Sequence, residues 1–321
     1  MQRRDFLMKL LAGTSVLKIN PAWAQQTANT SSVVFERPES GMPHRGKVLA
    51  AIQPHSDDIP LYAGGTVAKL IKEGYSGYMI RATNDDMGDD IGEPGTIGEN
   101  VLRNEREVEK VTQVLGLKHL FSLNYNNHRM GDISRNELQC RLIFLIRLLK
   151  LDTVFCYDPW GHDEENPDHY VLAHCVEAAS WMAGRDHDYP EQFAAGLKPH
   201  AVTEKYYYLR SPRPWQINRV VDISEEVEQK VDANLANVAK GPGGHHGTQL
   251  RAELARKGQR LPLLGNDDNT ADRNYIKEFV LARDRELGKK YGVEYAEQFH
   301  YVGPHRSRVD DYIKQHAVPL Q

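Results

Sequence analysis

Short apolar segments of strand length alternate with helical patterns through the first half of the chain, and this alternation constrains the fold more than any other feature. The expected strands lie at 47–53, 78–83, 120–123 and 153–157. The expected helices lie at 62–73, 100–115, 137–150 and 167–182. Strands separated by helices indicate βαβ units. We therefore predict an α/β fold with a mostly parallel sheet and helices on both faces.

Three further segments flank this alternating region. Residues 25–45 are polar and without period, which is typical of a linker or extended arm. The α/β domain is expected over 46–225. Beyond it the pattern is mostly helical, with a break rich in Gly, Pro and His at 241–247. We interpret 226–321 as a helical C-terminal extension packed on the same domain.

The N-terminal segment has the order of parts of an export signal. Arg3-Arg4 precede an apolar stretch over 7–16, and Ala22-Trp23-Ala24 forms a small-x-small cleavage site. An ordinary amphipathic first helix is the alternative. We interpret residues 1–24 as a twin-arginine signal peptide, which predicts a periplasmic or secreted mature protein.

Composition excludes several classes of protein. A pI of about 6.4 and the lack of any Lys/Arg run argue against a nucleic-acid partner. No apolar stretch approaches the roughly 18 residues that a membrane span needs. Cys140, Cys156 and Cys175 are too few for a disulfide framework, and none stands in a CxxC pair that would bind zinc.

Two polar clusters follow predicted strands, where ligands of open parallel sheets bind. His55, Asp57 and Asp58 come directly after the strand at 47–53, and Asp168-His169 come soon after the strand at 153–157. Capping of the next helix by Asp57 or Asp58 is the alternative for the first cluster. A surface histidine is the alternative for His169. Two histidines and one aspartate plus a water form an open catalytic zinc site, which indicates metal-assisted hydrolysis of a carbonyl compound.

These motifs resemble the LmbE-like, or PIG-L, zinc de-N-acetylases, a family with a Rossmann-like fold. The likeness runs from about residue 47 to about residue 299. Its two specific motifs are Pro54-His55-Ser56-Asp57-Asp58 and Asn166-Pro167-Asp168-His169, and its supporting motifs are Gly64-Gly65-Thr66, Leu115-Gly116, Val221-Asp222-Ile223 and His246-Gly247-Thr248-Gln249. The resemblance implies that 46–225 is a metal-binding catalytic domain.

The resemblance also implies a role for individual residues. It makes His55, Asp58 and His169 the ligands of one zinc ion per chain, although such ligands also accept iron or manganese. Asp57 would be the general base, and Asp168 would orient a neighbouring polar group. The residues implied to contact substrate are Arg103 or Arg106, Asn127 and His246.

Two positions depart from the family pattern. Asn166 replaces a histidine that assists the reaction; its amide can hydrogen-bond an oxyanion but cannot donate a proton as an imidazolium does. His162 is an alternative source of that proton. Asn127 stands where the family has an aspartate.

The resemblance implies a zinc-dependent hydrolase that removes the acetyl group from an N-acetylglucosamine-type sugar or glycoconjugate. An amidase acting on a larger N-acyl conjugate is one alternative. A periplasmic sugar-binding protein with a vestigial metal site is another. A small carbohydrate is the expected partner in each case, and the sequence leaves the oligomeric state open.

Overall fold

The computed structural model describes residues 33–87, 95–304 and 307–319, so the signal peptide predicted over 1–24 lies outside the described residues. The strands are β1 Val34–Glu36, β2 Val48–Gln53, β3 Ser76–Thr83, β4 Leu120–Tyr125, β5 Thr153–Tyr157, β6 Glu204–Tyr208, β7 Arg219–Asp222 and β8 Ala296–Val302. The α-helices are α2 Asp58–Tyr62, α3 Gly64–Lys72, α4 Ile97–Val114, α5 Arg135–Leu149, α6 Pro167–Met182, α7 Glu191–Ala194, α8 Val227–Ala236, α9 His246–Arg256, α10 Asp268–Tyr275, α11 Ala282–Tyr291 and α12 Arg308–His316. The shorter turns are η2 Met130–Asp132, η3 Pro214–Gln216, η4 Pro262–Leu264 and the π-helical η5 Ile276–Val280.

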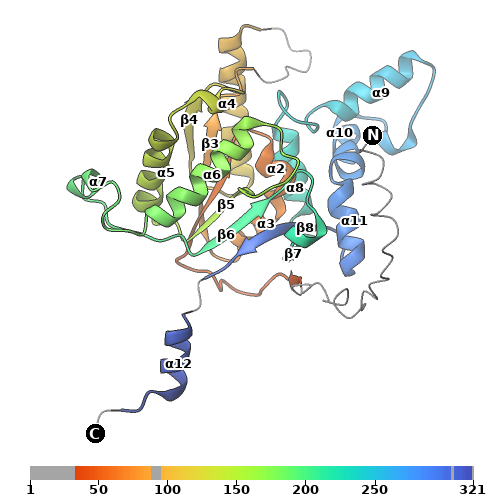
Figure 1. Ribbon diagram of the computed structural model, residues 1–321. Helices are drawn as coiled ribbons and strands as arrows, with labels where there is room; N and C mark the ends of the chain where they lie inside the picture. Colours follow the sequence, from red (N-terminus) through yellow and green to blue (C-terminus); the bar gives the residue numbers. More distant parts are fainter. Residues whose placement is uncertain (1–32, 88–94, 305–306, 320–321) are drawn as a thin grey trace, which may run out of the picture. The chain divides into compact units, whose positions relative to one another are not determined.

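The described strands form one eight-stranded sheet in the order β1-β7-β8-β6-β5-β2-β3-β4 (Figure 1). All neighbouring strands are parallel except β8, which runs antiparallel to both β6 and β7. The central strand β2 pairs with β3 on one side and with β5 on the other, where Ala50 lies opposite Val154. The predicted α/β fold with a mostly parallel sheet is confirmed.

Three elements differ from the expectations. The helix expected over 62–73 begins earlier and is divided at Ala63, whose φ of −143° interrupts α2 and α3. The segment expected as a linker contains β1, which pairs with β7. The C-terminal segment is not wholly helical, because β8 enters the sheet between β7 and β6. β8 was missed because its pairing partners lie 74 to 97 residues away in the sequence, as Asp222↔Ala296 and Lys205↔Val302 show, and no local pattern indicates such pairing.

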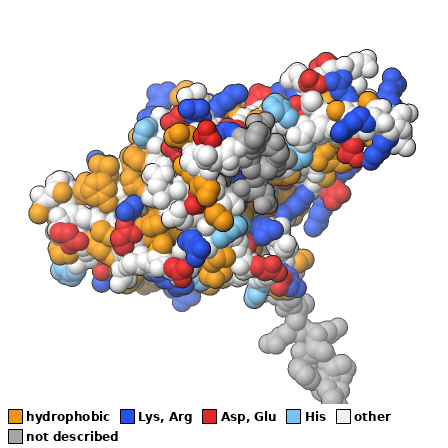
Figure 2. Space-filling view, turned by 90° about the horizontal axis from the view of Figure 1, so that it is seen from above, with side chains coloured by type: hydrophobic (Ala, Val, Ile, Leu, Met, Phe, Trp, Pro, Cys, Tyr) orange, Lys and Arg blue, Asp and Glu red, His pale blue; other side chains and the backbone are white. Residues whose placement is uncertain are grey.

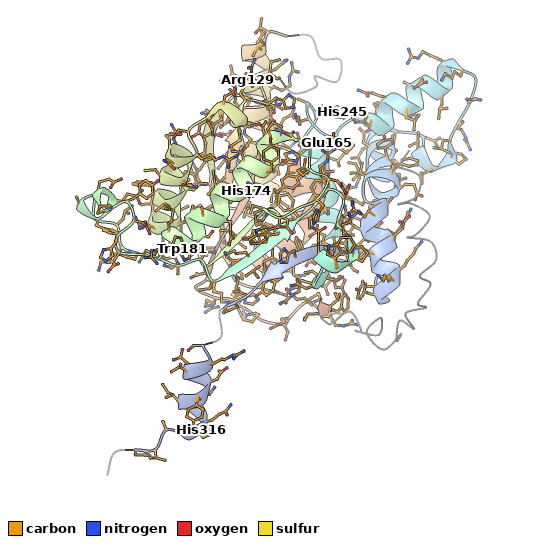
Figure 3. The ribbon with its side chains drawn as sticks, viewed as in Figure 1. Arg129, Glu165, His174, Trp181, His245 and His316 are labelled. Atoms are coloured by element: carbon orange, nitrogen blue, oxygen red, sulfur yellow. The ribbon has the colours of Figure 1, made fainter. Side chains whose placement is uncertain are left out.

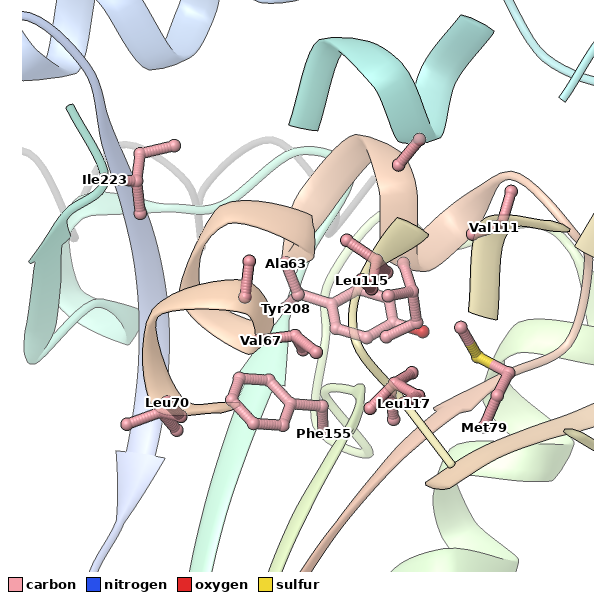
Figure 4. Close-up of a cluster of buried hydrophobic side chains, with 14 of the residues drawn as sticks. Ala63, Val67, Leu70, Met79, Val111, Leu115, Leu117, Phe155, Tyr208 and Ile223 are labelled. Carbon is pink, nitrogen blue, oxygen red and sulfur yellow. The ribbon is translucent and has the colours of Figure 1, made fainter. Parts of the chain in front are cut away.

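The hydrophobic core lies on both faces of the sheet, and the strand period of two divides it. Along β2, Leu49 and Ala51 face the side covered by α3, α4 and α8, while Ala50 and Ile52 face α5 and α6. Figure 4 shows part of the cluster on the side of α3, α4 and α8, to which Val67, Val111 and Phe155 contribute from two helices and a strand. Because these strands are buried on both faces, the parallel part of the sheet has continuous apolar runs in its sequence.

The surface carries mixed charge. On the face seen in Figure 2, Lys and Arg side chains are interspersed with Asp and Glu, in keeping with the pI of about 6.4. No helix within the described ranges is both long and apolar enough to cross a bilayer.

Candidate metal centre and active site

The carboxyl ends of the parallel strands bring the predicted site residues together. His55 follows β2 directly, and His169 lies in the first turn of α6, after the loop that follows β5. Figure 3 shows Glu165 of that loop and Arg129, which follows β4, on the same upper side of the molecule. The chain therefore places segments more than 100 residues apart at one edge of the sheet.

Helix capping does not explain the acidic pair at 57–58. The Asp57 side chain makes no capping hydrogen bond at the start of α2. The backbone N–H of Ile59 donates instead to Gln53 Oε1 at 2.9 Å. Asp58 Oδ2 accepts from the backbone N–H of His55 at 2.9 Å, which closes the turn and points this carboxylate at the imidazole. Neither Asp57 nor Asp58 therefore caps the next helix, which was the alternative interpretation of this pair.

His55, Asp58 and His169 form a compact group of three buried side chains. One ligand atom from each lies within 4.8 Å of the other two. His55 Nδ1 is 3.1 Å from His169 Nε2 and 3.5 Å from Asp58 Oδ2. Two imidazole nitrogens and one carboxylate are a donor set that suits zinc with an open coordination position. The residues present therefore fit a divalent metal ion.

The charges around His55 favour a cation at this point. Burial by itself would lower the pKa of His55, but hydrogen bonding to Asp168 and Asp58 outweighs it and raises the pKa to about 10. The same histidines hold the pKa of Asp58 at about 2, against burial, which would raise it. A cluster that stabilises positive charge so strongly can exchange its proton for a metal ion.

Asp168 supports the group from behind. Its Oδ2 lies 3.1 Å from His55 Nε2 and accepts from the backbone N–H of His128 at 2.6 Å, and its Oδ1 accepts from the N–H of Met130 at 3.2 Å. Burial would raise the pKa of this carboxyl, yet these hydrogen bonds hold it below its usual range. A carboxylate on the far nitrogen of a ligating histidine fixes its tautomer and orientation. The orienting role of Asp168 stays a prediction with which these contacts are compatible.

Two residues that the motifs did not identify complete the surroundings of His169. The Tyr157 ring stacks on the His169 ring, with centroids 4.1 Å apart, and its hydroxyl donates to Asp58 Oδ1 at 2.8 Å. Glu164 Oε1 lies 3.0 Å from His169 Nδ1. The position of Tyr157 as the last residue of a buried strand was the available signal. Glu164 lay unnoticed in an acidic loop.

Asp57 stands beside the group without belonging to it. Burial and the neighbouring charge of Asp58 raise its pKa to about 6. A loop folds over this side chain: a Cβ on Gly241 would lie 2.8 Å from the Cβ of Asp57, so glycine alone allows the approach. Gly241 also has a φ of +84°, which glycine adopts at no steric cost. Asp57 is therefore a fixed carboxylate that is still largely ionised at neutral pH.

Asn166 has a structural task. Its side-chain oxygen accepts from the backbone N–H of Asp168 at 3.0 Å and caps α6. The same residue that departs from the family pattern thus begins the helix that carries His169. His162, the alternative proton source, is exposed and lines a small cavity with Tyr157 and Glu164.

The predicted substrate residues differ in their surroundings. Arg106 is exposed, whereas Arg103 is half-buried on the face of α4 that it shares with Glu107. Glu107 accepts from the backbone N–H groups of Val238 and Ala239, just before the loop over Asp57, so the geometry favours Arg103.

Asn127 and His246 occupy contrasting places. The Asn127 side chain is fully buried, and within the described ranges neither of its polar atoms has a hydrogen-bond partner. The ring of His246 stacks on Tyr275 with centroids 5.8 Å apart, and its Nδ1 lies 2.6 Å from Gly243 O. His246 is thus tied to the C-terminal helices.

Known proteins resemble this chain in sequence. The family model described as PIG-L, GlcNAc-PI de-N-acetylase, matches residues 50–180. A diacetylchitobiose deacetylase from Thermococcus kodakarensis is 30% identical over 198 residues, which cover 61% of this chain and 71% of that protein.

Two solved structures extend the likeness of fold over most of the chain. An N,N'-diacetylchitobiose deacetylase from Pyrococcus horikoshii matches with a TM-score of 0.63 and 23% identity, covering 83% of this chain and 89% of that one. GalB, a 4-carboxy-2-hydroxymuconate hydratase from Pseudomonas putida, matches with a TM-score of 0.57 and 16% identity, covering 82% and 98%. Because one fold carries two different reactions, the fold by itself does not assign one. The match over residues 50–180, the relative's identity and the convergence of the two motifs together show that the chain belongs to the PIG-L (LmbE-like) family.

Proposed function

We propose that this protein is a zinc-dependent de-N-acetylase that hydrolyses the acetamide of an N-acetylglucosamine-type sugar or glycoconjugate. The observation that carries the proposal is the buried group of His55, Asp58 and His169 with the separate carboxylate of Asp57 beside it. The relative named as a diacetylchitobiose deacetylase supports the choice of an acetylated amino sugar.

The residues have distinct tasks in this reaction. His55, Asp58 and His169 would hold the zinc ion, which when bound polarises a carbonyl and makes water more acidic. Asp168 and Tyr157 keep the ligands oriented through their contacts with His55 and Asp58. This support holds the metal-binding atoms in place before substrate arrives.

Asp57 moves the proton. With a pKa of about 6, its carboxylate is mostly ionised at pH 7 and can accept a proton from the water that attacks the acetyl carbon. When the C–N bond breaks, the same carboxyl can return the proton to the leaving nitrogen. Water and the acetamide then balance to acetate and the protonated amine, and Asp57 is again a carboxylate. This route needs no imidazolium at position 166, where the chain has a capping amide.

The test is amine release by zinc-loaded protein lacking residues 1–24, with N-acetylglucosamine and N,N'-diacetylchitobiose as substrates and Asp57→Asn as the variant. We expect the variant to lose at least about 100-fold in turnover, the range in which one acid–base group contributes. Zinc content, measured by atomic absorption, should stay at one per chain. An Asp57→Asn protein with full activity would contradict the mechanism.

Results with the wild-type protein distinguish the proposed deacetylase from the two alternative functions. Silence on both sugars with amine release from larger N-acyl conjugates would favour the amidase reading. Sugar binding without amine release from any substrate would favour a binding protein.

We also propose export by the twin-arginine route, supported by the order of Arg3-Arg4, the apolar stretch and Ala22-Trp23-Ala24. Replacing both arginines by lysine should keep the full-length protein in the cytoplasm, measured by fractionation. Unchanged export would contradict this.

A further inference from the structure

An apolar groove of about 470 Å³ lies at one edge of the sheet, between β4 and α5. Phe121 and Leu123 of β4 form one wall, and Phe144 and Leu145 of α5 form the other. β4 is the last strand of the sheet and lies beside α5 (Figure 1), so in the described part of the chain no further strand covers its outer edge. None of the residues that line this groove belongs to the metal centre.

The apolar surface continues from the groove along α5. Phe144 and Leu148 are 39% and 47% exposed, and they lie on the same face because they are four residues apart. Both side chains belong to a helix whose opposite face is buried in the core, where Leu142 and Ile146 pack. A contiguous apolar surface of this kind marks a site of interaction with another protein segment.

α12 has an apolar face of matching spacing. Val309, Tyr312 and Ile313 are each more than half exposed and lie on one side of the helix, since they follow the i, i+3, i+4 pattern. Val309 and Ile313 are one turn apart, as Phe144 and Leu148 are. None of the described residues of α12 is buried. A helix of nine residues is only marginally stable in water by itself, so packing of this face would stabilise it.

The segment before α12 is too short to place this helix in the groove of its own chain. In the sheet, β8 and β4 are five strand spacings apart, which corresponds to about 24 Å. Val302 ends β8 and Arg308 begins α12, and the six residue steps between them span at most about 21 Å when fully extended. The groove can therefore receive α12 only from a second copy of the chain.

The charges favour one orientation of the two helices. The polar face of α12 carries two basic and two acidic residues, namely Arg308, Lys314, Asp310 and Asp311. It thus lacks the excess of basic residues that is typical of helices lying on membranes. Asp310 is in the first turn of α12, and the exposed Lys150 directly follows α5. An antiparallel arrangement brings these opposite charges together and also pairs opposite ends of the two helix dipoles.

We propose that α12 of one molecule binds antiparallel to α5 in the apolar groove of a second molecule, and that two copies exchange this helix reciprocally. Ile313 would lie against Phe144, and Val309 against Leu148. Reciprocal exchange gives a closed dimer with two-fold symmetry. Because each contact involves one short helix, the interface is small, and we expect a dissociation constant of about 1–50 μM. Below that concentration the chain is a monomer whose stability does not depend on α12.

Sedimentation velocity of the protein lacking residues 1–24, at about 1–200 μM, tests the proposal. We expect the wild-type protein to change from monomer to dimer over this range. Ile313→Asp and Leu148→Asp should each raise the dissociation constant at least about 30-fold, because the symmetric dimer loses the apolar contact twice. Leu102→Asp is the matched control, since Leu102 is 56% exposed on α4 outside the groove, and it should leave the dissociation constant unchanged. All replaced side chains are exposed, and circular dichroism verifies that each variant is folded.

A charge exchange tests the antiparallel contact itself. Lys150→Glu and Asp310→Lys should each weaken the dimer about three- to tenfold, and the double variant should return to within about twofold of wild type. A wild-type protein that stays monomeric at 200 μM, or a dimer that persists in both Ile313→Asp and Leu148→Asp, would overturn the proposal. A double variant that is weaker than either single variant would likewise overturn it. None of these outcomes depends on whether the protein is a deacetylase.

Discussion

The contact between Gly241 and Asp57 makes a single glycine decisive for the site. An alanine there would bring its Cβ within 2.8 Å of the Asp57 Cβ and 3.1 Å of Oδ2, at a φ of +84°. Displacing a reacting group by about 1 Å can cost about 100-fold in rate. We therefore expect Gly241→Ala to lower kcat/KM for amine release by about tenfold to 100-fold.

Gly258 provides the matched control for this variant. It has a φ of +67°, and apart from its chain neighbours no atom of the described residues lies within 4 Å of where its Cβ would be. Gly258→Ala should therefore share only the backbone cost of a positive φ, about 1–2 kcal/mol in the free energy of unfolding. Equal kinetic losses in the two variants would show that the contact with Asp57 is unimportant.

Asn166 caps α6 and also stands where the family has a histidine, so its variants can separate a structural role from a role in the reaction. Its oxygen caps α6, so Asn166→Ala should lower the free energy of unfolding by about 1 kcal/mol, whereas Asn166→Ser should keep most of the cap. Urea unfolding of the three proteins measures this. If the cap is the residue's main task, activity should follow stability and survive in the serine variant. Full loss of activity in Asn166→Ser would instead assign the amide a contact with substrate.

At the scale of elements, the start of α3 depends on a buried group of charges. Glu297 of β8 accepts from the backbone N–H groups of Gly65 and Thr66 at 2.9 and 2.8 Å. Lys230 of α8 donates to Glu297 and to Asp284 at 2.6 Å each. Burial, opposed by Lys230, raises the pKa of Asp284 to about 6. One lysine of α8 thus compensates two carboxylates, one from β8 and one from α11.

Replacing this lysine should be costly, and more so at high pH. Lys230→Met leaves Glu297 and Asp284 without their partner, which predicts a loss of about 3–5 kcal/mol. The pKa of Asp284 would then rise further above its value in the unfolded chain. Acids with a raised folded pKa contribute stability below the unfolded pKa and lose it as pH rises through the folded pKa. The deficit should be larger at pH 8 than at pH 5, measured by chemical denaturation.

The control is the exposed ion pair between Glu253 of α9 and Lys257, which directly follows that helix. Lys257→Met should cost less than about 1 kcal/mol and show no comparable dependence on pH. If both variants showed the same dependence on pH, the buried charges of Lys230, Glu297 and Asp284 would not be its cause.

Helices and strands could be predicted from the sequence where residues within the same segment determine them. The strands at the centre of the sheet and helices α4, α5 and α6 were predicted within a few residues, because each has its own apolar pattern and its own cap or stop. Thr96 and Ser134, for example, cap α4 and α5 through local hydrogen bonds. β1 and β8 were not predicted, since both are fixed by pairing with strands far away in the sequence and not by a local pattern.

The same limit applies to the site. His55, Asp58 and His169 could be brought together from the sequence because two motifs follow strands of one parallel sheet. Tyr157 and Gly241 could not, since their roles come from side chains of other segments. The glycine pair at 64–65 shows the same dependence: a Cβ on Gly65 would lie 2.7 Å from Ile223, so two motifs that were only supporting in the sequence contact each other in the fold.

At the scale of the whole molecule, β8 joins the two parts of the sheet. It pairs with β6 on one side and with β7 on the other, whereas α12 has no buried residue. Deleting residues 294–321 should therefore prevent folding, since it leaves β6 and β7 without a common neighbour. Deleting residues 304–321 should change the free energy of unfolding by less than about 0.5 kcal/mol. Circular dichroism and urea unfolding measure both; a folded 1–293 chain would contradict this role of β8.

The place of β8 in the sheet also sets the order in which the molecule can be assembled as it is synthesised. The ribosome makes β2, β3, β4 and β5 early, and they can pair as they emerge. β6, which ends in three tyrosines, follows and pairs with β5 along one edge, while its other edge stays unpaired until β8 is made close to the end of the chain. Unpaired edges of this kind recruit strands from other chains. Translation that stops early therefore releases an aggregation-prone chain. The sheet of each molecule can be completed only after β8 has been synthesised.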